Sequence, residues 1–177
     1  MENKILHNIL LSFLFSFFLT SCNDVENKGN ETKNIDYQQQ KESVEKANRY
    51  LVAKESEEIN DYIERRALKF ERSGTGLAYC IVVRGRGLQI KRNETISMDY
   101  ETRLLTGDVL YSSKKDGIKT FVVGKGGVES GLEEAVVNMH HGDVAEIVIP
   151  SHLAFGLIGD GKKVPPRATL IYKIKIL

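Results

Sequence analysis

The sequence has little of three things that mark common classes of protein: charge of one sign, cysteine and long apolar runs. Its 25 Lys and Arg residues are balanced by 24 Asp and Glu residues, so the formal net charge is +1. Because nucleic-acid binding proteins usually carry a clustered basic excess, this balance argues against that class. The 177 residues, 41% of them hydrophobic, predict one folded domain with an appendage.

Only two cysteines are present, Cys22 and Cys80, which excludes a framework of several disulfides. Cys80 lies in the apolar run LAYCIVV at 77–83, where a buried, inert thiol is a simpler interpretation than a nucleophile. Two fates of Cys22 remain open. Either it is modified and Cys80 stays unpaired, or the two cysteines form a disulfide.

No apolar run is long enough to cross a bilayer as a helix, which takes about 20 residues. The longest, ILLSFLFSFFL at 9–19, follows the positive charge of Lys4 and is followed by Thr20, Ser21 and Cys22. This arrangement predicts a signal peptide at 1–21, and the sequence LTSC resembles a lipobox, where cleavage precedes a cysteine that becomes lipidated. Cys22 is therefore predicted to be a lipid anchor that holds the protein at the cell envelope, facing the periplasm or the cell surface. The alternative is a plain secretory signal with an incidental Cys22.

Two segments are predicted between the signal peptide and the folded domain. Residues 22–40 have almost no apolar side chains to offset the entropy of ordering, so they predict a flexible tether. Residues 41–72 predict a helical arm, because they contain no Pro or Gly and carry opposite charges four residues apart, as at Glu42 and Lys46. The arm either packs on its own domain or dimerises with a second copy through its apolar stripe, and the interruption of that stripe favours the first interpretation.

Residues 73–177 predict an α+β domain. Alternating apolar and polar residues with turn signals between them predict strands at 77–83, 96–105, 109–112, 120–123, 144–149 and 169–176. A helix is predicted between the fourth and fifth strands, beginning with a capping box of Ser130 and Glu133 and ending at Gly142. One helix beside a mostly antiparallel set of strands belongs to the α+β class.

Short motifs follow one another in a fixed order along 96–177. They are Met98-Asp99-Tyr100, Leu104-Leu105-Thr106-Gly107, Tyr111-Ser112-Ser113, Phe121-Val122-Val123-Gly124, Gly131-Leu132-Glu133-Glu134, Ala154-Phe155-Gly156, Val164-Pro165-Pro166 and Ala168-Thr169-Leu170. This series resembles the FKBP-type peptidyl-prolyl cis-trans isomerases. The resemblance implies an antiparallel sheet curled around one short helix, activity on proline-containing polypeptides, and no cofactor or metal. Arg65-Arg66 and the helix before it resemble what precedes the domain in an FKBP-type lipoprotein branch associated with gliding motility.

The resemblance also implies a site. It gives catalytic roles to Tyr100, Phe155 and Tyr172. It implies substrate-binding roles for Leu110, Tyr111, Phe121, Val128, Glu129, Leu132 and Val164. Within that set, the backbone amide of Glu129 would bind the peptide carbonyl.

Three positions depart from the family pattern. Tyr111, Leu132 and Phe155 stand where members usually carry Asp, Trp and Tyr, so reduced activity is expected, and macrolide binding is expected to suffer more than isomerisation. The function implied is assistance to the folding of exported proteins. The alternative is a noncatalytic peptide-binding or assembly lipoprotein that reuses the fold.

Other sites find little support. His140-His141 follows the predicted helix and has no third ligand nearby in sequence, so a helix cap is favoured over a metal pair. Ser151-His152 is not in a G-x-S-x-G turn, which argues against a hydrolase. The glycines from 124 to 127 lack the βαβ context of a phosphate-binding loop.

Overall fold

The computed structural model describes the backbone from Val25 to Leu177 and the side chains from Asp36 onward. The predicted signal peptide and the predicted lipid anchor Cys22 lie outside the described residues. The chain divides into two compact units, one ending at Arg49 and the other comprising Tyr50–Leu177. Within the described residues, no helix is both long enough and apolar enough to cross a membrane.

The first described element is helix α2, Val25–Glu64. The prediction of a flexible coil was wrong for residues 25–40, which are helical. These residues lack proline and are rich in Glu, Lys and Gln, which favour helices, and extending an existing helix costs far less free energy than nucleating one. The helix ends at Glu64, earlier than the predicted arm, and Glu71–Arg72 form a short strand, β1, that the sequence did not predict.

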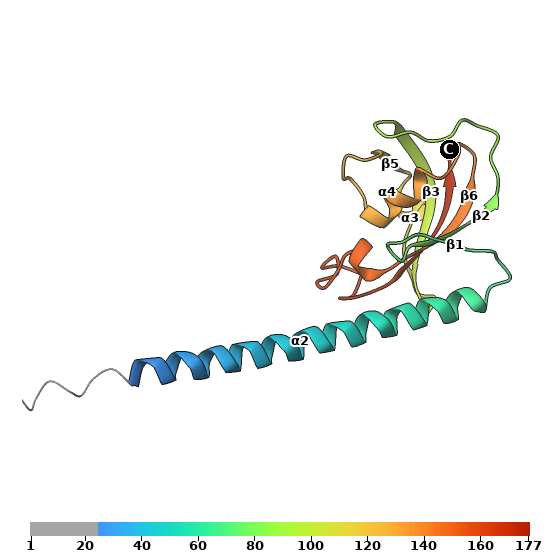
Figure 1. Cartoon of the computed structure of the whole chain (residues 1–177). Helices are drawn as coiled ribbons and strands as arrows, with labels where there is room; N and C mark the ends of the chain where they lie inside the picture. The colour runs from blue at the N-terminus through green and yellow to red at the C-terminus, as the bar shows by residue number, and fades with distance from the viewer. Residues whose placement is uncertain (1–24) are drawn as a thin grey trace, which may run out of the picture. The chain divides into compact units, whose positions relative to one another are not determined.

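Seven strands form one antiparallel sheet, with the order β1-β2-β6-β7-β3-β4 and with β5 paired to β3 (Figure 1). After β1, the strands are β2 Ala78–Val83, β3 Thr95–Leu104, β4 Val109–Ser112, β5 Lys119–Val122, β6 Val144–Ile149 and β7 Leu170–Ile176. All six predicted strands are present, because their alternating patterns are strong and turn residues bound them. The predicted α+β class is confirmed, with an antiparallel sheet and one short helix, α4 Ser130–Val136, against it.

Helix α4, Ser130–Val136, buries Leu132, Ala135 and Val136 in the main core of the sheet. The predicted capping box is wrong. The hydroxyl of Ser130 donates a hydrogen bond to the Leu153 carbonyl at 3.2 Å, and Glu133 accepts one from the Gly126 amide at 3.0 Å. Tertiary contacts with neighbouring loops have replaced the local cap.

The predicted end of α4 at Gly142 is also wrong, since the helix stops at Val136. The amide of Met139 donates to the Val136 carbonyl over three residues, which tightens and ends the helix. Gly142 has a φ of +86° in the turn before β6. Its amide donates to the Ile176 carbonyl at 3.2 Å.

The part of α2 inside the Tyr50–Leu177 unit packs on the sheet. Ile59 and Tyr62 are buried in a second cluster with Ala78, Val148 and Ile171. The Tyr62 hydroxyl also donates to Glu146 Oε1 at 2.7 Å. This segment therefore packs on its own domain, while dimerisation through the rest of the helix stays a prediction.

Two short helical turns were not predicted. They are α3, Ser113–Asp116, and a 3-10 turn at Ser151–Leu153. Each has fewer residues than a periodic apolar pattern needs to be visible in sequence. The second turn begins the loop between β6 and β7, which carries part of the candidate site.

Candidate functional site

Two tyrosines on neighbouring strands form the centre of the candidate site. Tyr100 lies on β3 and Tyr172 lies on β7, which pairs with it through the register Thr102 to Tyr172. Their ring centroids are 6.3 Å apart at an interplanar angle of 32°. Both side chains are buried, with 9% of Tyr100 and 1% of Tyr172 exposed, so they form the inner wall of the site.

The tertiary structure gathers the predicted site residues around these two rings. Leu132 comes from α4, Phe121 from β5 and Val164 from the loop between β6 and β7, and all three are buried in the same cluster. The partly buried members packed against that cluster include Leu110, Tyr111, Val128 and Phe155. The set therefore forms one neighbourhood despite its spread along the sequence.

The side chain of Glu129, one of the predicted site residues, lies inside the site. The resemblance implied a role for its backbone amide, but its carboxylate is also turned into the site and is only 8% exposed. Oε1 accepts a hydrogen bond from the Tyr172 hydroxyl at 2.6 Å. Oε2 lies 4.0 Å from the Lys119 ammonium, too far for a hydrogen bond, and has no hydrogen-bond partner among the described residues.

Lys119 is a site residue that the sequence analysis missed. Its ammonium lies 4.9 Å from the centroid of the Tyr100 ring and 5.6 Å from that of Tyr172, within range of a cation–π interaction with both. A usable signal was present, because Lys119 and Phe121 are two residues apart on β5 and so point to the same side of the strand. Because Phe121 was expected to point into the site, the side chain of Lys119 could have been expected to point there too.

An open hollow adjoins the ion pair of Lys119 and Glu129. It has a volume of about 510 Å³, within the range of small-ligand sites, which starts at about 300 Å³. Its walls are Lys119, Gly126, Gly127, Val128, Glu129, Ser130, Ala154 and Phe155. Tyr100 and Tyr172 do not line it, and the Lys119 ammonium lies over both of their rings.

The rim of the site joins β4 to the loop between β6 and β7. The Tyr111 hydroxyl donates a short hydrogen bond to Asp160 Oδ2, and this bond, with burial, raises the pKa of Tyr111 to about 12. Asp160 Oδ1 accepts the amides of Lys162, Lys163 and Val164 at 2.8 to 2.9 Å. Burial acts to raise the pKa of Asp160, but the hydrogen bonds from Tyr111 and these amides prevail and lower it to about 2.

The predicted helix cap at His140-His141 is wrong, because α4 has ended before it. The ring of His141 lies between Glu94 Oε1 at 2.7 Å and the Leu177 carbonyl at 3.0 Å. The His140 amide donates to Asp143 Oδ2 at 2.9 Å. No cluster of three or more potential ligands is placed to hold a metal ion within the described part of the chain.

A family model described as FKBP-type peptidyl-prolyl cis-trans isomerase matches residues 87–177, just over half of the chain. The chain belongs to this family. Its FKBP-type domain therefore contains β3 to β7, α4 and every predicted site residue except Cys22.

Two bacterial relatives extend the similarity. The chain is 36% identical over 106 residues to the probable FKBP-type peptidyl-prolyl cis-trans isomerase FkpA of Neisseria meningitidis, covering 59% of this chain and 38% of that protein. It is 30% identical over 154 residues to the outer membrane protein MIP of Legionella longbeachae, covering 79% and 65%. The chain thus spans less than two thirds of the length of either relative.

Solved structures of FKBP-type proteins share the fold. The crystal structure of AtFKBP13 matches with a TM-score of 0.58 and 30% identity, covering 60% of this chain and 95% of that one. The crystal structure of FkpA from Escherichia coli matches with a TM-score of 0.63 and 24% identity, covering 100% and 81%. The second match is evidence of fold alone.

Proposed function

We propose that this protein is a peptidyl-prolyl cis-trans isomerase that assists the folding of exported polypeptides. Rotation about an Xaa-Pro bond faces a barrier of about 18–20 kcal/mol and breaks no covalent bond. The reaction therefore needs a site that binds the twisted amide better than the planar one, and each 1.36 kcal/mol of such preference is about tenfold in rate. The observation that carries the proposal is the convergence of Tyr100, Tyr172 and Phe155 beside an open hollow in an FKBP-type domain.

The site residues divide into two groups in this proposal. Phe155 and Val128 line the open hollow and would contact the incoming peptide first, with the Glu129 amide binding its carbonyl. Tyr100, Tyr172, Leu132 and Val164 form the buried wall against which the prolyl ring would pack. Leu110 and Tyr111 would bind at the rim, and Phe121 would support the wall from the core.

Reduced activity is part of the proposal. Leu132 stands where the family usually has the larger Trp, and Phe155 stands where it usually has Tyr with its hydroxyl. The Tyr111 hydroxyl donates its hydrogen bond to Asp160 and is not free to bind substrate. The Lys119 ammonium also occupies the space over Tyr100 and Tyr172. A prolyl ring has to displace it, which costs the cation–π attraction of both rings.

The deciding experiment is exchange spectroscopy by NMR on an Xaa-Pro peptide. Acceleration of cis/trans exchange by the wild type, with large losses in Tyr100→Ala and Phe155→Ala, would support the proposal. Tyr50→Ala, which removes a 67% exposed tyrosine outside the site, serves as the matched control and should leave exchange unchanged. No acceleration at high protein concentration would end the isomerase proposal.

A noncatalytic peptide-binding module is the second candidate. It is favoured by one specific observation, the Lys119 and Glu129 ion pair inside a site that isomerisation needs to be apolar. In the same NMR experiment, it would give shifted peptide resonances on binding without faster exchange. The two functions are therefore separated by one titration.

We also propose that Cys22 anchors the protein by lipid at the cell envelope. The support is the LTSC sequence after an apolar run and, more distantly, the name outer membrane protein MIP borne by one relative. The gliding-motility branch rests on the sequence resemblance of the helix and Arg65-Arg66. Mass spectrometry of the mature protein tests the anchor, since a diacylglyceryl group on Cys22 should disappear in Cys22→Ser, and an unmodified Cys22 would refute it.

A further inference from the structure

The loop between β6 and β7 carries two of the proposed substrate contacts. It runs from Ser151, just after β6, to Thr169, just before β7, and contains Phe155 and Val164. The strands it joins are paired up to Ile149 and Leu170, so the two ends of the loop lie side by side. Whatever holds these two ends together sets the base from which Phe155 and Val164 project.

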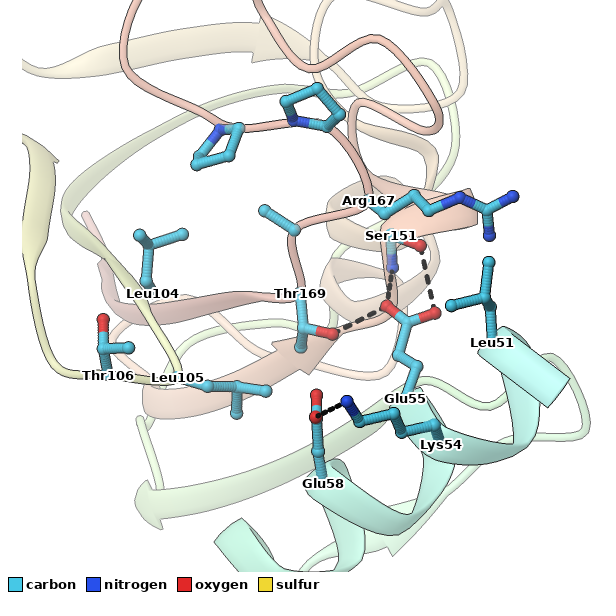
Figure 2. A pocket seen from close by; sticks show the side chains of 13 residues that line it. Leu51, Lys54, Glu55, Glu58, Leu104, Leu105, Thr106, Ser151, Arg167 and Thr169 are labelled. Atoms are coloured by element: carbon cyan, nitrogen blue, oxygen red, sulfur yellow. Dashed lines mark hydrogen bonds and ion pairs between the residues drawn. The ribbon is translucent and has the colours of Figure 1, made fainter. Parts of the chain in front are cut away.

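One carboxylate from helix α2 holds both ends. Glu55 Oε1 accepts the Ser151 amide at 2.6 Å and the Thr169 hydroxyl at 2.7 Å (Figure 2). Glu55 Oε2 accepts the Ser151 hydroxyl at 3.0 Å. Hydrogen bonds to a charged acceptor are stronger than neutral ones, and Ser151 and Thr169 are 7% and 5% exposed, so water competes little for them.

The hold on Ser151 extends directly to the site. The Gly156 amide, next to Phe155, donates to the Ser151 carbonyl at 2.8 Å. The Gly156 carbonyl in turn accepts the Arg167 amide at 2.8 Å. A chain of hydrogen bonds therefore runs from Glu55 through Ser151 to the residue that follows Phe155.

A hollow of about 330 Å³ lies beside the Glu55 contacts. Its lining side chains come from α2 on one side and from the loop on the other (Figure 2). Leu51 and Lys54 of α2 face it from one side, and Pro165, Pro166 and Ala168 of the loop line it from the other. Across this space, Glu55 makes hydrogen bonds to both ends of the loop, at Ser151 and at Thr169.

We propose that Glu55 is a positioning residue for the isomerase site, which holds the loop in the form that binds substrate. The inference rests on the proposed function. Without the carboxylate, the loop would populate its binding form for only a fraction of the time, and apparent affinity falls by that fraction. KM for an Xaa-Pro peptide should then rise by about tenfold while kcat changes by less than about twofold.

The test compares four variants. Glu55→Ala removes all three hydrogen bonds and should show the rise in KM. Glu55→Gln keeps an acceptor at Oε1, so its KM should stay within about twofold of the wild-type value. If Glu55 acted through its charge alone, KM would rise in Glu55→Gln as it does in Glu55→Ala. Thr169→Val removes one bond with little change of shape and should give an intermediate KM. Glu58→Gln is the matched control, since Glu58 lies about one turn along α2 and pairs with Lys54 at 3.9 Å.

Amide hydrogen exchange gives a readout that does not depend on catalysis. Exchange at Gly156 and Arg167 should accelerate in Glu55→Ala but stay at the wild-type rate in Glu58→Gln. Unchanged exchange at these amides, or faster exchange with an unchanged KM, would overturn the inference. If the wild type shows no isomerase activity, the proposed function fails on that result, while peptide affinity and hydrogen exchange still decide the role of Glu55. If Glu55→Ala does not fold, Thr169→Val provides the same decision.

Discussion

The hydroxyl of Tyr172 donates a hydrogen bond to Glu129 Oε1 at 2.6 Å inside the cluster proposed to bind proline. Burial, followed by the negative charge of Glu129, raises the pKa of Tyr172 far above its ordinary value, so the hydroxyl stays protonated. The Lys119 ammonium, 4.0 Å from Glu129 Oε2, completes a polar group in an otherwise apolar neighbourhood. Substitutions in this group are therefore expected to change both the stability of the domain and the binding of peptide at its site.

Removing the Tyr172 hydroxyl should destabilise the domain. In Tyr172→Phe, Glu129 Oε1 loses its hydrogen bond while remaining buried, and leaving a buried acceptor unsatisfied costs about 1–3 kcal/mol. Urea unfolding measures the loss in the free energy of unfolding. Tyr79→Phe is the matched control, because its hydroxyl donates to Glu71 at an exposed position, and it should cost less than about 1 kcal/mol. Equal losses of unfolding free energy in the two variants would contradict the claim that burial makes the Tyr172 hydrogen bond the more stabilising one.

Replacing Lys119 should open the aromatic wall. Lys119→Met keeps most of the apolar stem but removes the charge held over Tyr100 and Tyr172, so a prolyl ring no longer displaces a cation–π contact of about 0.5–1 kcal/mol. KM for an Xaa-Pro peptide should fall about two- to fivefold, as measured by exchange NMR across peptide concentrations. Lys119→Arg should not show this gain. Lys115→Met, an exposed lysine on α3, is the control, and a higher KM in Lys119→Met would show that the ammonium binds substrate instead.

The rim contact between Tyr111 and Asp160 should make stability depend on acid pH. The pKa of Asp160 is lowered from 3.8 to about 2, so the folded state favours the charged carboxylate. The resulting stabilisation is complete above pH 3.8 and is lost as pH falls towards 2. Wild type should therefore be more stable than Asp160→Asn at pH 7, and the difference should shrink near pH 2 to 3.

Urea unfolding of both proteins at several pH values measures this effect. Asp99→Asn, which changes an exposed carboxylate on β3, is the comparison variant. A difference between wild type and Asp160→Asn that is the same at pH 7 and pH 2.5 would mean that the charge of Asp160 does not stabilise the loop.

Local patterns in the sequence were sufficient for much of the sheet. The alternation of Leu170, Tyr172, Ile174 and Ile176 predicted β7, because side chains on a strand point to opposite faces in turn. The prediction of a coil at 25–40 was wrong, since composition reports whether a segment can bury apolar surface but not whether a neighbouring helix extends into it. The capping box of Ser130 and Glu133 was wrong for a related reason, because its partners Leu153 and Gly126 come from other segments.

The candidate site divides in the same way. The order of motifs along 96–177 was enough to predict the family and the set of residues that meet around Tyr100 and Tyr172. The inward carboxylate of Glu129, the position of Lys119 over the two rings and the attachment of both loop ends to Glu55 were decided by tertiary structure alone. Sequence by itself determines which residue types recur at which spacing. The pairing of buried charges and hydroxyls across strands, helix and loop depends on distances that exist only once the chain has folded.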